Sequence, residues 1–428
     1  MNCLRILLFT IQLTVLSFYL SASELYDMLV KLPGVVKVEE KGTNPFFSEK
    51  YLVWFEQALD QDNPAAGTFR QRVFVNHKSF DIPVVYTTEG YNGDYAAEDK
   101  YINELCRILT ANEVFVEHRY FSESVPDPVN WEYLTTKNAA TDHHTIFKAL
   151  KTIYHGKWVS TGISKGGETC LLYQMYYPDD MDAVVAYVAP VAKAVEDGRH
   201  EIFISKTGTS KDRKKILDFQ KEILKRREII FPMFENFVKA SNLTFRLPLE
   251  EVYDYCVLEF SFSFWQWYGN TDRIPSKKES NTILFQYFIA VAGPAYFSIE
   301  GSESTFPFFY QAARELGYYG YDTKPFKKLL VIESAEEYLS KIFIPEEMKI
   351  NFEPQTSINL EKFISSDAKN TFMIYGEYDP WTAVAPDPGE NKNVKKIISP
   401  KGTHMTRILN LPKILQDEIV KDLDKIMN

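Results

Sequence analysis

The stretch Lys157-Trp158-Val159-Ser160-Thr161-Gly162-Ile163-Ser164-Lys165-Gly166 decides the fold of this chain. The part up to Ile163 reads as a strand, and the residues from Gly166 to Tyr177, which Pro178 follows, read as a helix. A serine between two glycines at such a turn is held in a strained backbone conformation that exposes its hydroxyl. The glycines let the chain turn without a clashing Cβ atom. We therefore predict a nucleophile at Ser164 rather than an idle surface serine.

Strands and helices alternate on both sides of this turn. Predicted strands are 51–55, 72–75, 82–88, 113–117, 157–163, 182–188, 371–375 and 394–399, and predicted helices are 98–110, 138–153, 166–177 and 412–427. This alternation predicts a mostly parallel sheet with helices on both of its faces. Together with a serine at the end of a strand, it predicts the α/β-hydrolase fold.

The alternation stops between residues 193 and 345, where the chain is largely helical and aromatic. One long amphipathic helix is expected there, over 211–230. The chain has 428 residues, which is large for one ordinary domain. We therefore predict a core formed by 24–192 and 346–428, interrupted by a helical cap domain over 193–345.

The N-terminus has the three parts of a secretory signal peptide. Arg5 supplies a positive charge, an apolar run extends from Ile6 to Leu20, and small residues occupy Ser21 to Ser23. The apolar run is shorter than the ~20 residues that a membrane span needs. We predict that residues 1–23 are cleaved and that the protein is secreted or periplasmic, with no stable membrane span afterwards.

Charge and cysteine content exclude several partners. The formal net charge is −10, which makes nucleic acid an unsuitable partner because phosphate binding needs a basic surface. Once Cys3 has left with the signal peptide, Cys106, Cys170 and Cys256 remain, which allows one disulfide or none. Nothing resembles a CxxC pair or a Cys/His cluster, so we expect no metal and no cofactor.

An activated serine needs a base, and the base needs a carboxylate that orients it. The α/β-hydrolase fold supplies them in the order serine, acid, histidine. His404 alone among the seven histidines lies after the last predicted strand, and Asp379 follows the strand 371–375. Glu377 is a competing acid, and Asp387 is a weaker one because it lies further from the strand. We predict a Ser164–His404–Asp379 triad.

The oxyanion of the tetrahedral intermediate needs two hydrogen-bond donors. One should be the backbone N–H of Lys165, the residue that follows the nucleophile. The second should come from the loop after the strand that ends near Thr88, and Gly90 and Tyr91 are the two candidates.

Several short motifs, in the same order along the chain, resemble one group of serine peptidases. They are Phe55-Glu56-Gln57 with Leu59-Asp60, Gly67-Thr68-Phe69-Arg70-Gln71-Arg72, Glu117-His118-Arg119-Tyr120-Phe121, Phe309-Tyr310-Gln311 with Glu315-Leu316-Gly317, Asp379-Pro380-Trp381 and Gly402-Thr403-His404. They are similar to segments of prolyl carboxypeptidases and dipeptidyl peptidases. The versions Thr88-Glu89-Gly90-Tyr91 and Gly162-Ile163-Ser164-Lys165-Gly166 most resemble the PS-10 tripeptidyl aminopeptidase family, serine peptidase family 37.

This resemblance, which covers nearly the whole chain after the signal, implies an exopeptidase that removes short peptides from free N-termini. It also implies the same triad and a helical cap over the site. One departure is Met405, because the prolyl carboxypeptidase group has a second histidine after the catalytic one. The departure concerns substrate specificity and leaves the triad intact.

An aminopeptidase must bind a cationic α-amine, which requires a buried carboxylate near the site. Glu89 is the first candidate, and Glu117 and Glu315 are others. Alternatively, Glu89 and Glu117 form structural ion pairs with Arg119 or another base. Trp265 lies in an aromatic stretch, 260–268, and is a further candidate for the lining of the substrate cleft. Alternatively, the rings of this stretch form the core of the cap.

Three functions are compatible with these features. The first is a serine exopeptidase acting on peptides with a free N-terminus. The second is a carboxylic ester hydrolase on the same fold, with a prolyl carboxypeptidase-like enzyme as a variant, because fold alone does not determine function. The third is a binding protein that retains the fold without catalysis. The oligomeric state stays open.

Overall fold

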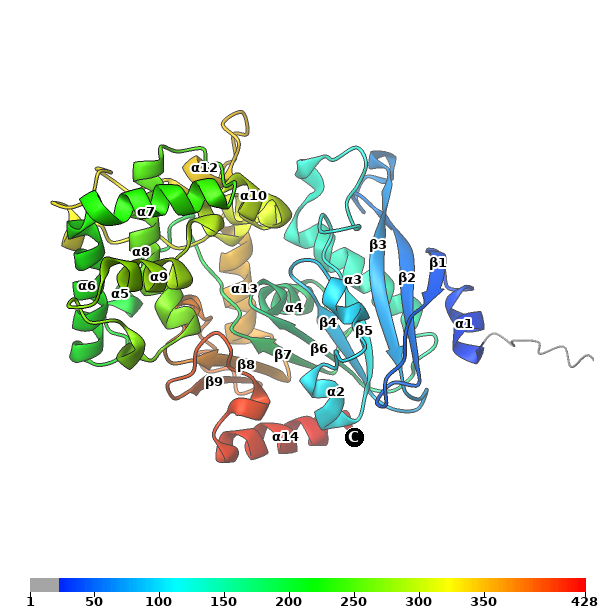
Figure 1. Ribbon diagram of the computed structural model, residues 1–428. Coiled ribbons are helices and arrows are strands. Elements are labelled where there is room, and N and C mark those ends of the chain that lie inside the picture. Colours follow the sequence, from blue (N-terminus) through cyan, green and yellow to red (C-terminus); the bar gives the residue numbers. More distant parts are fainter. Residues whose placement is uncertain (1–22) are drawn as a thin grey trace, which may run out of the picture.

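The computed structural model describes residues 23–428, so the predicted signal peptide lies outside the described residues except for Ser23. Within them, nine strands form one sheet in the order β1-β2-β3-β5-β4-β6-β7-β8-β9 (Figure 1). The strands are β1 (Val35–Glu40), β2 (Glu49–Ala58), β3 (Thr68–His77), β4 (Val84–Thr88), β5 (Asn112–Val116), β6 (Trp158–Ile163), β7 (Ala183–Tyr187), β8 (Thr371–Gly376) and β9 (Val394–Ser399).

The sheet is antiparallel at one side and parallel over the rest. β1 with β2, β2 with β3 and β3 with β5 pair antiparallel, whereas every pairing from β5 through β4 to β9 is parallel. This confirms the predicted α/β-hydrolase fold with a mostly parallel sheet. Since the carboxyl ends of parallel strands share one edge, the residues that follow β6, β8 and β9 come together there.

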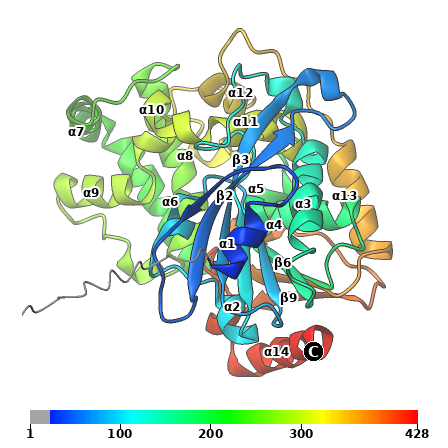
Figure 2. The same ribbon diagram turned by 90° about the vertical axis from the view of Figure 1, so that its right-hand side faces the viewer.

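Helices cover both faces of the sheet (Figure 2). α2 (Glu104–Leu109) and α14 (Lys413–Met427) share a hydrophobic core with one face, while α1 (Glu24–Leu29) and α3 (Thr136–Leu150) share another core with the opposite face. α4 (Lys165–Tyr176) and α13 (Gln355–Ser366) pack beside α3 on that second face. The sheet is therefore buried on both sides, as parallel sheets require.

The remaining helices lie between β7 and β8 and gather beside the sheet in Figure 1. They have a large aromatic core of their own. We call them the cap. They are α5 (Arg199–Ile204), α6 (Ser210–Lys225), α7 (Arg227–Ala240), α8 (Leu249–Trp267), α9 (Asn281–Val291), α10 (Ile299–Ser302), α11 (Phe306–Gln311) and α12 (Tyr338–Phe343).

Two predicted helices differ from the structure. The helix expected over 98–110 begins only at Glu104, because the Asn103 side chain accepts the backbone N–H of Leu105 and so caps the helix there. The helix expected over 211–230 is divided at Arg226, whose guanidinium holds the Lys277 carbonyl of another segment at 2.6 Å. The short strand β1 was not predicted.

The three cysteines of the described chain, Cys106, Cys170 and Cys256, are buried free thiols. Among the helices of residues 23–428, none is at once long enough and apolar enough to cross a membrane.

Candidate active site

Ser164 lies at the sharp turn between β6 and α4. Its backbone has φ 57° and ψ −124°, a conformation that few residues other than glycine adopt. Its N–H donates to the Tyr187 carbonyl of β7 at 2.8 Å. A Cβ on Gly162 would lie 2.1 Å from the Gly166 carbonyl oxygen, so only glycine fits at this position. The turn thus holds a partly exposed serine hydroxyl above the carboxyl end of the sheet.

Asp379 and His404 meet at the ends of β8 and β9. The Asp379 Oδ2 atom lies 2.7 Å from His404 Nδ1, and both side chains are buried. An ionised carboxylate only accepts hydrogen bonds, so His404 Nδ1 donates and Nε2 is left to accept a proton. The competing acids lie elsewhere. Glu377 is exposed and accepts the Lys401 N–H at 2.7 Å, and Asp387 is also exposed.

Ser164 and His404 share Trp267 as a neighbour. The Trp267 ring stands edge-on to the His404 ring, with centroids 5.2 Å apart, and lines the same cavity as Ser164. Within residues 23–428, no direct hydrogen bond joins the Ser164 hydroxyl to the imidazole. In enzymes without substrate such contacts are often long and tighten when the substrate binds.

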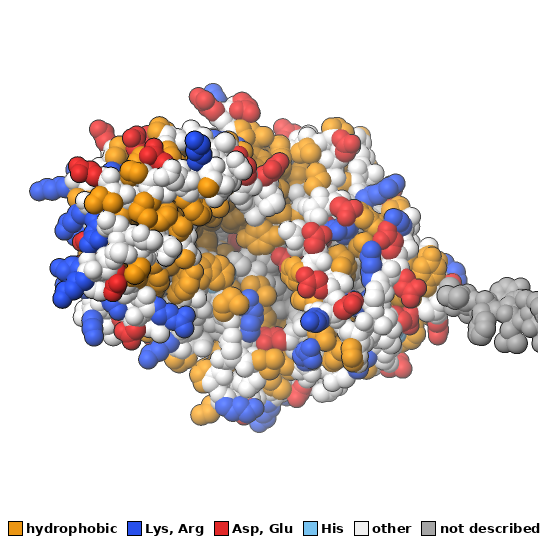
Figure 3. Space-filling view, in the orientation of Figure 1, with side chains coloured by type: hydrophobic (Ala, Val, Ile, Leu, Met, Phe, Trp, Pro, Cys, Tyr) orange, Lys and Arg blue, Asp and Glu red, His pale blue; other side chains and the backbone are white. Residues whose placement is uncertain are grey.

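The cavity at Ser164 lies between core and cap and has a volume of about 490 Å³. Figure 3 shows this region as a hollow rimmed by hydrophobic side chains. The volume falls within the range of small-ligand sites, about 300–1,000 Å³. Several of the lining residues come from the core, namely Tyr91, Ser164, Lys165, Glu168, Pro190, Ala192 and Trp381. Others come from the cap, including Glu259, Ser263, Gln266, Trp267, Tyr296, Phe308, Tyr318 and Tyr319.

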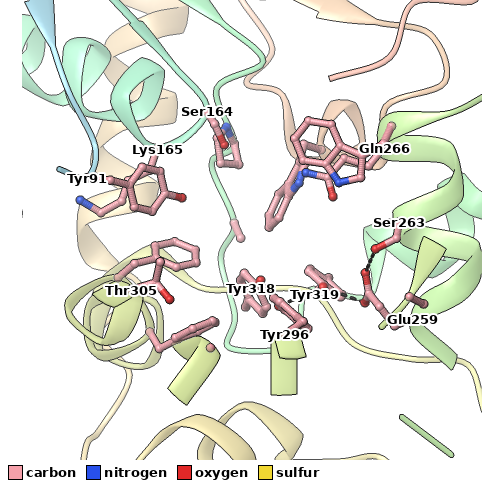
Figure 4. A pocket seen from close by; sticks show the side chains of 18 of the residues that line it. Tyr91, Ser164, Lys165, Glu259, Ser263, Gln266, Tyr296, Thr305, Tyr318 and Tyr319 are labelled. Carbon is pink, nitrogen blue, oxygen red and sulfur yellow. Dashed lines mark hydrogen bonds between the residues drawn. The ribbon is translucent and has the colours of Figure 1, made fainter. Parts of the chain in front are cut away.

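Glu259 of α8 lies across the cavity from Ser164 (Figure 4). Its carboxylate accepts hydrogen bonds from the Tyr319 hydroxyl at 2.9 Å, from the Tyr321 hydroxyl at 2.8 Å and from Ser263. Only 4% of the residue is exposed, and this burial raises the pKa of Glu259 to about 7. A rigidly held carboxylate inside a cavity is suited to bind a cation.

Lys165 and Glu168 form the wall beside Ser164. The Lys165 ammonium is buried and has no hydrogen-bond partner among residues 23–428, and it lies over the rings of Tyr91, at 5.9 Å, and Phe121, at 5.4 Å. Burial lowers the pKa of Lys165 to about 7 and raises the pKa of Glu168 well above its ordinary value. The charge state of this wall therefore changes near neutral pH.

The predicted oxyanion donors differ in their partners. The Lys165 N–H belongs to the first turn of α4, where backbone N–H groups have no partner within the helix. By contrast, the N–H groups of Gly90 and Tyr91 both donate to the carboxylate of Glu89, at 2.9 and 3.2 Å. Gly90 still packs against the turn, because a Cβ on it would lie 2.5 Å from the Gly166 nitrogen.

Three predicted substrate contacts do not reach the cavity. Glu89 accepts the two N–H groups named above and the Tyr95 hydroxyl. Glu117 is fully buried and paired with Arg72, whose Nε lies 2.9 Å from the carboxylate, as the structural alternative predicted. Glu315 accepts the backbone N–H of Thr136 at 2.7 Å. All three carboxylates therefore hold the core together.

Of the predicted stretch 260–268, the aromatic residues Trp267 and Tyr268 line the cavity at Ser164, but Trp265 does not. The residue is 1% exposed and lines a second cavity of the cap, of about 340 Å³, instead of the cavity at Ser164. Its ring packs edge-on against Tyr378, with centroids 5.0 Å apart, next to Asp379. The alternative reading, cap core, is the correct one.

Sequence reasoning missed Glu259, which lies one residue before the predicted aromatic stretch that contains Trp267. Both lie on α8, whose residues from Val252 to Phe260 are buried without interruption. A charged residue in a run of aromatic and apolar side chains was the available signal. In residues 23–428, no group of three or more His, Cys, Asp or Glu side chains is arranged to hold a metal ion.

Comparison with known proteins identifies the family of this chain. The family described as PS-10 peptidase S37 matches residues 20–418. The prolyl tri/tetrapeptidyl aminopeptidase of Streptomyces mobaraensis is 30% identical over 414 residues, which cover 95% of this chain and 84% of that protein. The lysosomal Pro-X carboxypeptidase of Mus musculus is 28% identical over 167 residues, 35% of this chain and 34% of that protein.

Among solved structures, the proline iminopeptidase of Mycobacterium smegmatis has a TM-score of 0.41 and 12% identity, covering 87% of this chain and 98% of that one. The family match extends over almost all of the sequence and includes the serine turn, both later strand ends and the cap. The chain therefore belongs to the PS-10 peptidase S37 family and is a serine peptidase.

Proposed function

We propose that the protein is an aminopeptidase that releases short peptides from free N-termini and cleaves after proline. Ser164, His404 and Asp379 act as its triad. The name of the Streptomyces mobaraensis relative, a prolyl tri/tetrapeptidyl aminopeptidase, supports both the mode of cleavage and the preference for proline.

In the proposed reaction the Ser164 hydroxyl attacks the carbonyl carbon of the scissile bond while His404 Nε2 takes the hydroxyl proton. The same proton then passes to the leaving amine, and an acyl-enzyme remains. Water, activated by His404, hydrolyses the ester and regenerates Ser164. Asp379 holds the imidazole in one tautomer throughout, through its hydrogen bond at Nδ1.

Glu259 is the observation that carries the proposal. It is one of two carboxylates in the lining of the cavity, and it lies on the opposite wall from Ser164. A peptide bound with its α-ammonium at Glu259 would extend across the cavity and present a bond near its N-terminus to Ser164. The cap closes around the cavity and thereby limits how many residues fit ahead of that bond.

The test is a comparison of two peptides that differ only at the N-terminus. A peptide with proline in the third position should be cleaved when its amine is free and resist cleavage when it is acetylated. Glu259→Gln should raise KM for the free peptide by about ten- to a hundredfold, which corresponds to loss of a hydrogen bond to a charged group. Equal cleavage of both peptides by the natural enzyme would refute the aminopeptidase assignment.

Glu201→Gln provides a matched control, because Glu201 lies in the cap but lines the second cavity. Its KM should stay unchanged. Turnover of simple carboxylic esters without any preference for peptides would favour the ester-hydrolase alternative. Mass spectrometry of a peptide-library digest would give the length of the released peptide and the residue before the cleaved bond.

The N-terminal sequence also supports the proposal that the enzyme is secreted or periplasmic, with residues 1–23 removed as a signal peptide. N-terminal sequencing of the protein recovered from cells is the test. A mature chain beginning at Glu24 is the expected result, and retention of Met1 would contradict it.

A further inference from the structure

The side chain of Tyr91 lies in the same cavity as the nucleophile Ser164. Its ring lines the Ser164 cavity, and its hydroxyl points into that cavity (Figure 4). The Ser164 side chain lines the same cavity. The phenol O–H thus faces the cavity in which Ser164 would attack a substrate carbonyl.

The backbone N–H groups at this loop are already in use. A backbone N–H carries one hydrogen, and those of Gly90 and Tyr91 both point at Glu89 Oε1. The Tyr95 hydroxyl holds the other oxygen of the same carboxylate, so three donors fix it. A developing oxyanion at Ser164 consequently finds the Lys165 N–H but no second backbone donor from this loop.

The Tyr91 ring is also held in place before any substrate binds. It packs edge-on against Phe121 of the core and Phe308 of the cap, with ring centroids 5.6 Å apart in both pairs. The Tyr91 carbonyl accepts the His118 N–H at 3.2 Å. A donor fixed in this way pays little entropy when it makes its bond, which is the property that transition-state stabilisation requires.

We propose that the Tyr91 hydroxyl is the second oxyanion donor and acts together with the backbone N–H of Lys165. The phenol keeps its proton throughout and donates a hydrogen bond that strengthens as negative charge develops on the carbonyl oxygen. Glu89 is then a positioning residue, since it shapes the loop that carries Tyr91. This inference rests on the proposed acyl transfer at Ser164.

The test is Tyr91→Phe, which keeps the ring packing and removes only the hydroxyl. Loss of one oxyanion donor lowers kcat by about 10²- to 10³-fold in other serine peptidases, and we expect a loss of that size with KM little changed. Tyr177→Phe is the matched control, because the Tyr177 hydroxyl lies 2.9 Å from the Thr141 hydroxyl and the residue is not part of the cavity at Ser164. Its kcat should stay within about twofold, since that hydroxyl is already engaged.

A second measurement distinguishes a catalytic hydroxyl from a structural one. A peptide boronate forms a tetrahedral adduct with the serine, whereas a tripeptide amide bound to Ser164→Ala protein resembles the ground state. Tyr91→Phe should weaken the boronate by a factor similar to the loss in kcat and leave the tripeptide affinity unchanged. Equal weakening of both ligands, or a kcat within threefold of the natural enzyme, would overturn the proposal.

Failure of the proposed function would look different, because Ser164→Ala would then retain activity. If Tyr91→Phe does not fold, 4-fluorophenylalanine at position 91 is the alternative, since the fluorine fills the place of the hydroxyl but cannot donate a hydrogen bond. The same loss in kcat is expected. A kcat within threefold of the natural enzyme would contradict the donor role.

Discussion

At the scale of single residues, the proposed activation of Ser164 depends on the hydrogen bond between Asp379 and His404. Asp379→Asn would present an amide N–H to Nδ1 and favour the wrong imidazole tautomer. We expect kcat to fall by about 10⁴-fold with the fold intact. Glu377→Gln, which alters an exposed carboxylate near the same strand end, should leave kcat unchanged. A loss below tenfold for Asp379→Asn, with a large loss for Glu377→Gln, would assign the acid to Glu377.

The titration of Glu259 gives a second prediction at this scale. Because burial raises the pKa of Glu259 to about 7, the carboxyl is neutral at lower pH and ionised at higher pH. An α-ammonium binds the ionised form and itself loses its proton near pH ~8. For peptides with a free N-terminus, kcat/KM should therefore fall steeply below about pH 7.

The acetylated peptide, whose slow residual cleavage is measured at high enzyme concentration, serves as the reference for this profile, since it has no ammonium. The ratio of the two kcat/KM values isolates the contribution of Glu259. This ratio should become independent of pH in Glu259→Gln. A ratio that changes with pH in the variant as it does in the natural enzyme would exclude Glu259 as the titrating group.

At the scale of elements, the junction of β6 and α4 depends on glycines that approach other backbone closely. In Gly162→Ala the new methyl would lie 2.1 Å from the Gly166 carbonyl, so the turn must open or the sheet must shift. We expect the free energy of unfolding to drop by about 3 kcal/mol and turnover to be lost.

Gly198→Ala is the control for that experiment. Gly198 precedes α5 with φ −62° and ψ −2°, and a Cβ there meets no atom within 4 Å. Alanine should leave the stability unchanged or raise it by about 0.4–1 kcal/mol. Chemical denaturation of the three proteins measures both effects. Equal stability of Gly162→Ala and the natural enzyme would show that the turn tolerates a side chain.

The elements themselves were largely predictable from sequence, because strand alternation, helix periodicity and turn glycines are local signals. The order of β6, β8 and β9 along the chain was enough to predict that Ser164, Asp379 and His404 lie at one edge of the sheet. The substrate carboxylate was not predictable in this way. Glu117 and Glu315 have partners, Arg72 and Thr136, that come from distant segments.

Helix α8 illustrates the same limit within one element. Its middle is buried on every side, so the sequence has no polar face that would reveal its orientation. Whether Glu259 or Trp265 faces the cavity depends on how α8 packs against the segment Pro380–Val384 and against Tyr319, which is a property of the tertiary structure. The triad residues were predictable because their positions after particular strands place them. Residues of α8 that line the cavity were not, because the sequence does not show which side of the helix faces it.

At the scale of the whole molecule, the site belongs to neither the core nor the cap alone. Ser164 is on the core and Glu259 is on the cap, and each has its own hydrophobic core around it. The two parts are also joined at α8, because the His404 N–H donates to the Gln266 carbonyl at 2.9 Å. A ligand that reaches from Glu259 to Ser164 should therefore bind the two parts together.

A ligand that contacts both the core and the cap should raise the free energy of unfolding. With Ser164→Ala protein to prevent turnover, a tripeptide amide ending in proline at 100 times its Kd should stabilise the fold by about 2.7 kcal/mol. The N-acetylated tripeptide should give a smaller rise in unfolding temperature at the same concentration, because it lacks the ammonium that the proposal places at Glu259. In protein that carries both Ser164→Ala and Glu259→Gln, the two tripeptides should raise the unfolding temperature equally. The contradicting result would be that the acetylated peptide stabilises the protein that retains Glu259 as strongly as the free peptide does. That result would place the ammonium outside the cap. The peptide would then bind across the cavity in the opposite direction.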